Sequence, residues 1–209
     1  MELFNHVVKT VTQLSVVMPD SILFGSILLY FITLNKSFGV FAIFIIELIL
    51  SHTFISRMFK ETTGESGYPI PQCFSGYKTA RPNVNRMMPN HQYPSYSFFS
   101  ITAIATYLGL STREYEDTMK AMGPQWEGRA VIAYMFIIGV LLTVLVVRLA
   151  FCEKPSELAI AFVLAILVGA AFFNINKMFF TSEAVNFLGL PYLISKNKDG
   201  DTIYVCGKV

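Results

Sequence analysis

The stretch AVIAYMFIIGVLLTVLVVRLAF, residues 130–151, decides the fold class, because it is apolar over almost the whole length that a helix needs to cross a bilayer. A hydrocarbon core takes about 20 apolar residues as a helix, and fewer where neighbours or local thinning help. Similar segments occupy residues 14–34, 38–56, 97–111 and 158–175. Together with a hydrophobic fraction of 54% and a mean hydropathy of +0.53, they predict an all-α, multi-pass transmembrane helical bundle with about five spans.

The connections between these segments define the domain organisation. A chain of 209 residues leaves room for one bundle, over residues 1–175, and for an extramembrane tail at 176–209. The first and third apolar segments are short, so the number of spans lies between four and six. In the tail, Asp199-Gly200 separates two β-prone runs and predicts a small hairpin, with a disordered tail as the alternative.

Local signals indicate where individual helices begin and end. Pro19-Asp20 is expected to separate a lead-in from the first span. Residues 112–129 are polar and are expected to form a short helix of their own, capped by Thr112 and ended by Gly123-Pro124. Residues 58–95 are rich in Gly, Pro, Asn and Tyr, which predicts an irregular loop over one end of the bundle, and such loops often carry function.

Charge and motif content exclude several classes of function. The net charge is +2 and no basic run occurs, so nucleic acid is not an expected partner. The apolar segments make the lipid bilayer the expected partner. No phosphate-binding glycine loop, nucleophile elbow or dinucleotide fingerprint occurs, so no cofactor is expected. His6, His52 and His91 would lie on one side of the membrane but lack metal-ligand spacing, so no metal site is expected.

The sequence predicts that the protein is integral to a membrane, for example an organellar or viral one. Basic residues are equally numerous in the loops of the two sides, so the positive-inside rule favours neither orientation. Cys73 and Cys152 would lie on the same side. They can pair only if that side is oxidising, and unpaired cysteines are the simpler expectation.

An acidic residue, Glu47, interrupts the apolar run FIIELIL. An acid at this depth costs a few kcal/mol, so it should face other helices or a cavity. It is either a proton or ion site, or a hydrogen-bonded packing contact, for instance to a Ser or Thr of segment 97–111. His52, near the end of the same apolar segment, is expected at the membrane interface.

Segment 97–111 differs from the others because it is rich in small and hydroxyl-bearing residues. Small residues allow helices to approach closely, and hydroxyls can bond across helices. This composition predicts a central helix surrounded by protein, which also explains how so short a span is tolerated.

Three polar places would meet on one side of the membrane: KTARPN at 78–83, Pro94-Ser95 before the third span, and the turn that follows Arg148. In this layout the chain resembles the type 2 phosphatidic acid phosphatase and vanadium haloperoxidase superfamily, over residues 38–175. The motifs of that family are K-x6-R-P, then P-S-G-H opening a helix, then S-R-x5-H-x3-D across two helices. The resemblance implies a degenerate phosphate pocket built from Lys78, Arg81, Ser95, Ser97, Arg148, Glu153 and Glu157.

Several residues depart from these motifs, and these departures determine which activity we expect. Both catalytic histidines of the family are replaced, by Ser97 and Glu153, and Phe74 and Val147 stand where the family has a lysine and a serine. In the family one histidine forms the phospho-intermediate and the other protonates the leaving group. A glutamate would also repel an incoming phosphate. The resemblance therefore implies an inactivated enzyme.

The leading hypothesis is a non-catalytic pseudoenzyme with a structural or scaffolding role among the proteins of a larger membrane-associated assembly, such as an organellar complex or a virion membrane. In that case Arg81 and Arg148 should converge at the start of the third span, neutralised by Glu153 or Glu157.

Two alternatives belong to other classes. One is an active lipid-phosphate phosphatase with rewired residues, which would use His91 or His52 as the base together with Arg81 and Arg148. The other is a small transporter or channel centred on Glu47.

Overall fold

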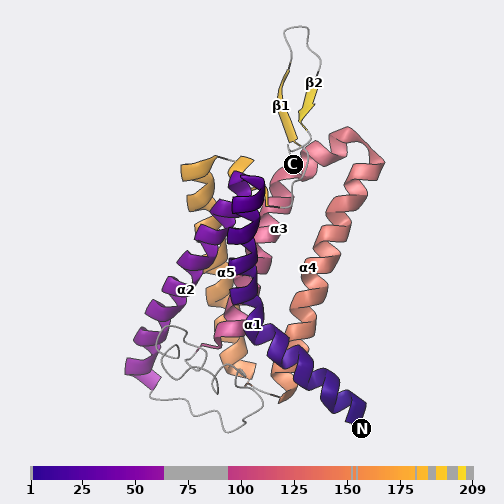
Figure 1. The fold of residues 1–209 in the computed structure, drawn as a ribbon. Helices are drawn as coiled ribbons and strands as arrows, with labels where there is room; N and C mark the ends of the chain where they lie inside the picture. Colours follow the sequence, from indigo (N-terminus) through magenta and orange to yellow (C-terminus); the bar gives the residue numbers. More distant parts are fainter. Residues whose placement is uncertain are drawn as a thin grey trace.

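The computed structural model describes residues 2–63, 94–151, 153, 155–181, 183–187, 192–196 and 202–205. Within them lie five long helices, α1 (Glu2–Thr33), α2 (Lys36–Thr63), α3 (Tyr96–Met122), α4 (Pro124–Phe151) and α5 (Pro155–Phe180). A short 3-10 turn, η4 (Glu183–Val185), follows α5. Strands β1 (Tyr192–Lys196) and β2 (Thr202–Val205) then form an antiparallel hairpin, which projects from one end of the helical bundle in Figure 1.

Within the part of the chain that the structure describes, three helices are long and apolar enough to cross a membrane, over residues 36–59, 128–150 and 155–180. The apolar part of α1, Val17–Thr33, is shorter. These helices indicate a membrane-embedded protein and agree with the predicted helical bundle. Helix α3 does not reach the same hydropathy because its second half contains the charged run REYEDTMK, residues 113–120.

Helix α3 is the central element of the bundle. Every residue from 96 to 104 is buried, and the helix packs against α1, α4 and α5. Helix α5 meets it with small residues, and a Cβ atom added to Gly169 would lie only 2.7 Å from the Ala103 carbonyl oxygen. The buried, closely packed position is the one that the small and hydroxyl-bearing residues of α3 predict.

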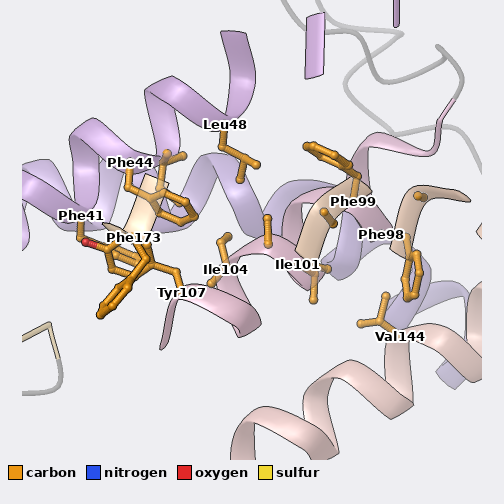
Figure 2. Packing of buried hydrophobic residues seen from close by; sticks show 14 of the residues in the cluster. Phe41, Phe44, Leu48, Phe98, Phe99, Ile101, Ile104, Tyr107, Val144 and Phe173 are labelled. Carbon is orange, nitrogen blue, oxygen red and sulfur yellow. The ribbon is translucent and has the colours of Figure 1, made fainter. Parts of the chain in front are cut away.

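Aromatic rings from α2, α3 and α5 pack against one another, and Figure 2 shows the cluster of Phe41, Phe44, Tyr107 and Phe173. The ring of Tyr107 stacks on Phe44, with ring centres 4.2 Å apart, and meets Phe173 edge-on at 5.4 Å. Phe41 stacks on Phe187, with ring centres 4.0 Å apart, so the segment after α5 folds back onto the start of α2. These contacts fix the relative positions of the three helices near Glu47.

The expected break at Pro19-Asp20 is wrong, because α1 runs through Pro19 as one helix. A proline inside a helix removes one backbone hydrogen bond and usually kinks the helix. Here Pro19 is buried, and Met18 and Ile22 pack against the main core, so tertiary contacts hold this region helical. The N-terminal part of α1 diverges from the other helices in Figure 1.

The expected short helix at 112–129 is also wrong, because α3 continues without interruption to Met122. Thr112 does not cap a helix: its hydroxyl donates to the Leu108 carbonyl at 2.9 Å, as a threonine within a helix does. Gly123 ends α3 with a φ of 116°, a conformation that favours glycine, and Pro124 begins α4. The last helix, α5, continues to Phe180, beyond the boundary predicted for the bundle at residue 175.

Candidate functional site

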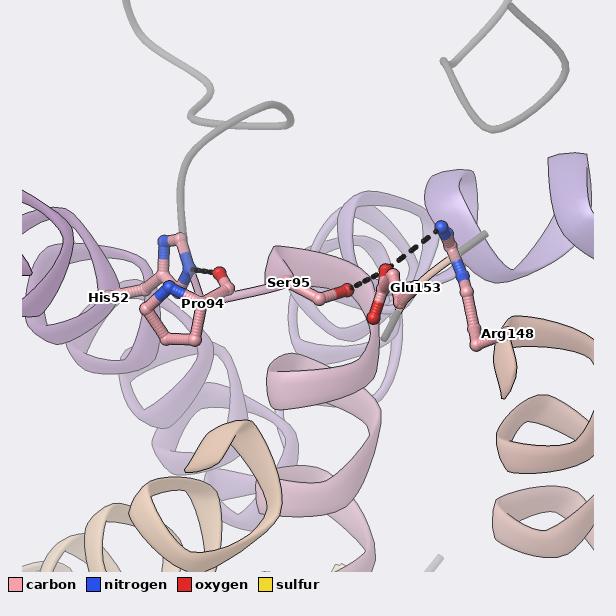
Figure 3. A network of polar contacts seen from close by, with 5 residues as sticks. All are labelled: His52, Pro94, Ser95, Arg148 and Glu153. Atoms are coloured by element: carbon pink, nitrogen blue, oxygen red, sulfur yellow. Dashed lines mark hydrogen bonds and ion pairs between the residues drawn. The ribbon is translucent and has the colours of Figure 1, made fainter. Parts of the chain in front are cut away.

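The candidate site lies where α3 begins and α4 ends, at the opposite end of the bundle from the hairpin (Figures 1 and 3). Ser95 is the residue before α3, and Arg148 lies in the last turn of α4. Glu153 belongs to the connection between α4 and α5. The backbone N–H of Glu153 donates to the Arg148 carbonyl at 3.0 Å, so a tight turn carries the carboxylate back towards the end of α4.

A single carboxylate oxygen joins the three side chains. Glu153 Oε1 accepts a hydrogen bond from the Ser95 hydroxyl and lies 3.3 Å from Nη1 of Arg148 (Figure 3). The side chains of Arg148 and Glu153 are only 4% and 5% exposed. The guanidinium is therefore neutralised inside the protein by a carboxylate of the same chain.

Burial is the dominant influence on the ionisation of Glu153. It raises the pKa of this carboxyl above 4.5, whereas Arg148 and the hydrogen bond from Ser95 act in the opposite direction. Glu157, in the first turn of α5, adds a repulsive contribution. The ion pair thus exists in surroundings that also favour the protonated acid.

His52 binds Pro94, the residue that precedes Ser95 of this cluster. Its Nε2–H donates to the Pro94 carbonyl at 2.6 Å, and its ring meets Tyr96 and Phe99 with centres 5.1 Å apart in both cases. The His52 side chain is fully buried beneath the start of α3, and its position at the level of the membrane interface stays a prediction. Since Pro94 and Ser95 are neighbours, α2 and the α4–α5 connection together position the first turn of α3.

The structure brings together three of the residues of the implied phosphate pocket, Ser95, Arg148 and Glu153. Ser97 is buried in the first turn of α3, and Glu157 interacts electrostatically with Glu153. The other implied or alternative site residues, and the cysteines considered for pairing, lie outside the described residues: Lys78, Arg81, His91, Cys73 and Cys152. The expected convergence of Arg81 with Arg148 therefore remains a prediction.

Glu47 has a different partner from the expected one. Its Oε2 accepts a hydrogen bond from Asn176 Nδ2 at 3.0 Å, so the contact comes from α5 and not from a hydroxyl of α3. Side chains lean towards the N-terminus of their helix, and α2 and α5 run in opposite directions, so these two side chains lean towards each other. Sequence reasoning missed Asn176, although a polar amide near the end of an apolar helix is the available signal.

The described part of the chain contains no group of three or more His, Cys, Asp or Glu residues that could hold a metal ion. No family model, curated protein or solved structure matches the chain.

Proposed function

We propose that the protein is a non-catalytic, multi-pass membrane protein with a structural role in a larger membrane-associated assembly. The observation that carries this proposal is the contact of one Glu153 oxygen with both Arg148 and Ser95. In the family that the sequence resembles, the residues corresponding to Arg148 and Ser95 belong to motifs that hold a phosphate. In this chain the carboxylate of Glu153 contacts both of these residues.

The chemistry of the cluster supports a pseudoenzyme. An arginine that binds phosphate must present free N–H donors to the incoming anion. Here the guanidinium is buried against a carboxylate, and an incoming phosphate would have to displace a bound negative charge. Glu153 also stands in place of the family's nucleophilic histidine, and Ser97 in place of the second histidine, so nucleophile and general acid are both absent from these positions.

We further propose that α1 and α3 cross the membrane with α2, α4 and α5, giving five spans. Support comes from the position of α3, whose first half is shielded from lipid by its neighbours. A helix surrounded by protein does not need a fully apolar surface. In this topology Arg57, Ser95 and Glu153 lie on one side of the membrane, and Gly123 and the hairpin lie on the other.

The outer surface of α4 supports contacts with other membrane components. This helix stands at the edge of the bundle in Figure 1 and packs mainly against α3. Its exposed face carries large apolar side chains along its whole length, suited to lipid and to neighbouring helices. They are Val131, Ile132, Met135, Phe136, Ile138, Leu142, Val146 and Leu149.

An activity assay tests the catalytic part of the proposal. The purified protein in mixed micelles with phosphatidic acid should release no more phosphate than protein-free micelles. The variant Ser97→His/Glu153→His should also be inactive, because Val147 and Phe74 still depart from the family's motifs. Turnover that persists through purification and disappears in Arg148→Ala would contradict the pseudoenzyme.

The structural role has its own test. Chemical cross-linking in the native membrane, followed by a denaturing gel, should place the chain in covalent adducts above its 23.5 kDa mass. Mass spectrometry then identifies the other proteins of these adducts. A strictly monomeric chain without cross-linked partners would remove the proposed structural role and leave the activity result unaffected.

A further inference from the structure

Helix α1 changes character at its residue 17. From Val17 to Thr33 it is apolar, and Met18 and Ile22 pack against the main core of the bundle. The same helix extends back to Glu2, and this N-terminal part diverges from the other helices at the end of the bundle opposite the hairpin (Figure 1). There the Leu14 side chain is 64% exposed. A large apolar side chain thus stands on a part of the helix that leaves the protein core.

The sequence of this N-terminal part divides into two faces. Successive residues of an α-helix are rotated by about 100°, so each position has a direction around the helix axis. On that basis the apolar positions within residues 2–14 fall inside an arc of about 140°. They are Leu3, Phe4, Val7, Val8, Val11 and Leu14. The polar positions occupy the opposite arc: Glu2, Asn5, His6, Lys9, Thr10, Thr12 and Gln13. Residues 2–14 therefore form an amphipathic helix.

The length of α1 places this amphipathic helix at a membrane surface. In the five-span topology, α1 crosses the bilayer with its apolar part, Val17–Thr33. This part rises about 25 Å, which is close to the thickness of a hydrocarbon core. A short turn joins α1 to α2, so residues 2–14 emerge on the side of the membrane where α2 ends. Pro19 lies just inside the crossing and removes one helical hydrogen bond, which allows α1 to bend there.

The lipid bilayer is the partner that fits these two faces. A helix with one apolar and one polar face lies in the plane of the membrane interface, with the apolar face buried about 5–10 Å deep. Residues 2–14 continue directly into the apolar part of α1, so the bilayer surface is always within their reach. The polar face carries one acid and one lysine, Glu2 and Lys9, which offer no net charge to steer a protein partner.

We propose that residues 2–14 of α1 form an interfacial anchor, with the apolar face in the lipid and the polar face in water. The apolar area provides the attraction, because the polar face has no excess of basic residues for anionic lipids. The anchor goes beyond the structural role proposed above. It rests on the five-span topology only for the crossing of α1.

Electron paramagnetic resonance of spin-labelled protein in phosphatidylcholine nanodiscs tests the anchor. The full-length chain carries one cysteine at a time, in a cysteine-free background. The apolar-face variants are Val7→Cys, Val11→Cys and Leu14→Cys, and the polar-face variants are His6→Cys, Lys9→Cys and Gln13→Cys. Oxygen concentrates in the bilayer and should relax the apolar-face labels several-fold more strongly than the polar-face labels. A water-soluble nickel chelate should show the reverse order, so that accessibility follows the helical period.

A matched pair of variants tests whether contact with lipid holds the helix in place. Val7→Asp/Val11→Asp puts two charges into the apolar face, so the segment should leave the bilayer and the nickel chelate should reach a label at Leu14→Cys. His6→Asp/Thr10→Asp adds two acids at the same spacing on the polar face, and that label should stay protected. Size-exclusion chromatography of each variant confirms that the protein is folded.

The possible results separate lipid from other covers of the apolar face. Alternating accessibility that is lost only in the apolar-face variant supports the anchor. Nickel access at every labelled position would overturn it, and so would oxygen access at every position. Apolar-face labels that neither reagent reaches would also overturn it, because protein would then cover this face. A pattern that appears only after phosphatidylglycerol is added would contradict an attraction based on apolar area.

The crossing of α1 has a separate measurement. In vesicles of known orientation, an impermeant maleimide should reach Lys9→Cys and Lys36→Cys from opposite sides. Labelling of both positions from one side would remove the five-span topology, whereas alternating accessibility in the same protein would still support the interfacial anchor. Failure of the topology and failure of the anchor are therefore distinguishable.

Discussion

Nη1 of Arg148 lies 3.3 Å from Oε1 of Glu153, and both side chains are almost completely withdrawn from solvent. The ion pair closes the connection between α4 and α5, and the same carboxylate oxygen reaches Ser95 at the start of α3. Buried ion pairs are costly to form but more costly to break, because removal of one partner leaves a buried charge. The pair therefore ties three helix ends together, and its loss has a predictable dependence on pH.

We predict that Arg148→Met destabilises the protein far more at pH 8 than at pH 5. Burial raises the pKa of Glu153, and without the guanidinium this pKa rises further. An acid with a raised pKa in the folded state favours folding most below its unfolded value, and that contribution is lost as the pH rises through the raised pKa. The cost should approach about 3–5 kcal/mol at pH 8, where Glu153 would be ionised and unpaired.

Unfolding in detergent, measured at both pH values, checks this expectation. The control is Arg148→Met/Glu153→Gln, which has no ionisable group at either position and should lose the pH dependence. If Arg148→Met lost the same free energy of unfolding at pH 5 and pH 8, the role assigned to Glu153 would be wrong.

A second prediction concerns the contact between α3 and α5. Gly169→Ala should lower the free energy of unfolding by about 1–3 kcal/mol, because overpacking of a close contact forces backbone shifts. The added Cβ would lie 2.7 Å from the Ala103 carbonyl oxygen and 3.1 Å from the Cβ of Thr106. The measurement is again unfolding in detergent.

The matched control is Gly139→Ala on the exposed side of α4, where a Cβ meets nothing within 4 Å. Alanine is the better helix former, so this variant should be unchanged or stabilised by up to about 1 kcal/mol. Equal destabilisation of both variants would show that the Gly169 contact is not the cause.

A buried hydrogen bond from the Ser111 hydroxyl to the Val185 carbonyl, at 2.9 Å, helps to hold the segment after α5 in place. Ser111→Ala should lower the free energy of unfolding by about 1 kcal/mol and leave the buried carbonyl without this donor. Limited proteolysis should cleave residues 181–187 faster in this variant. Thr143→Ala, which removes an exposed hydroxyl from α4, should leave the cleavage rate unchanged.

The sequence predicted the features that depend on composition and missed those that depend on how helices are rotated. Helices α2, α4 and α5 follow from apolar length alone, and the meeting of Ser95, Arg148 and Glu153 follows from the alternation of helix direction. Pro19 and Thr112 carry local signals for helix ends that packing overrides.

The partner of Glu47 shows the same limit at a single residue. A hydroxyl of α3 and the amide of Asn176 are equally suitable donors by chemistry. Which of them reaches the carboxylate depends on the relative rotation and tilt of α2, α3 and α5, and the rings around Tyr107 set that arrangement. Helical periodicity does not contain this information, because it describes each helix separately.

The last prediction concerns the path of α3 across the membrane. In a cysteine-free background, Arg57→Cys and Asp117→Cys should react with an impermeant maleimide from opposite sides, because α3 lies between them and crosses the bilayer in the five-span topology. The side chains of Arg57 and Asp117 are exposed. Each cysteine would therefore replace a charged residue near a helix end, away from the buried cluster. Intact vesicles of known orientation, labelled before and after permeabilisation, provide the measurement. Labelling of both positions from the same side would leave α3 outside the set of membrane-crossing helices. It would also remove the layout on which the resemblance to lipid-phosphate phosphatases depends, while the ion pair of Arg148 and Glu153 would stand as a purely structural feature.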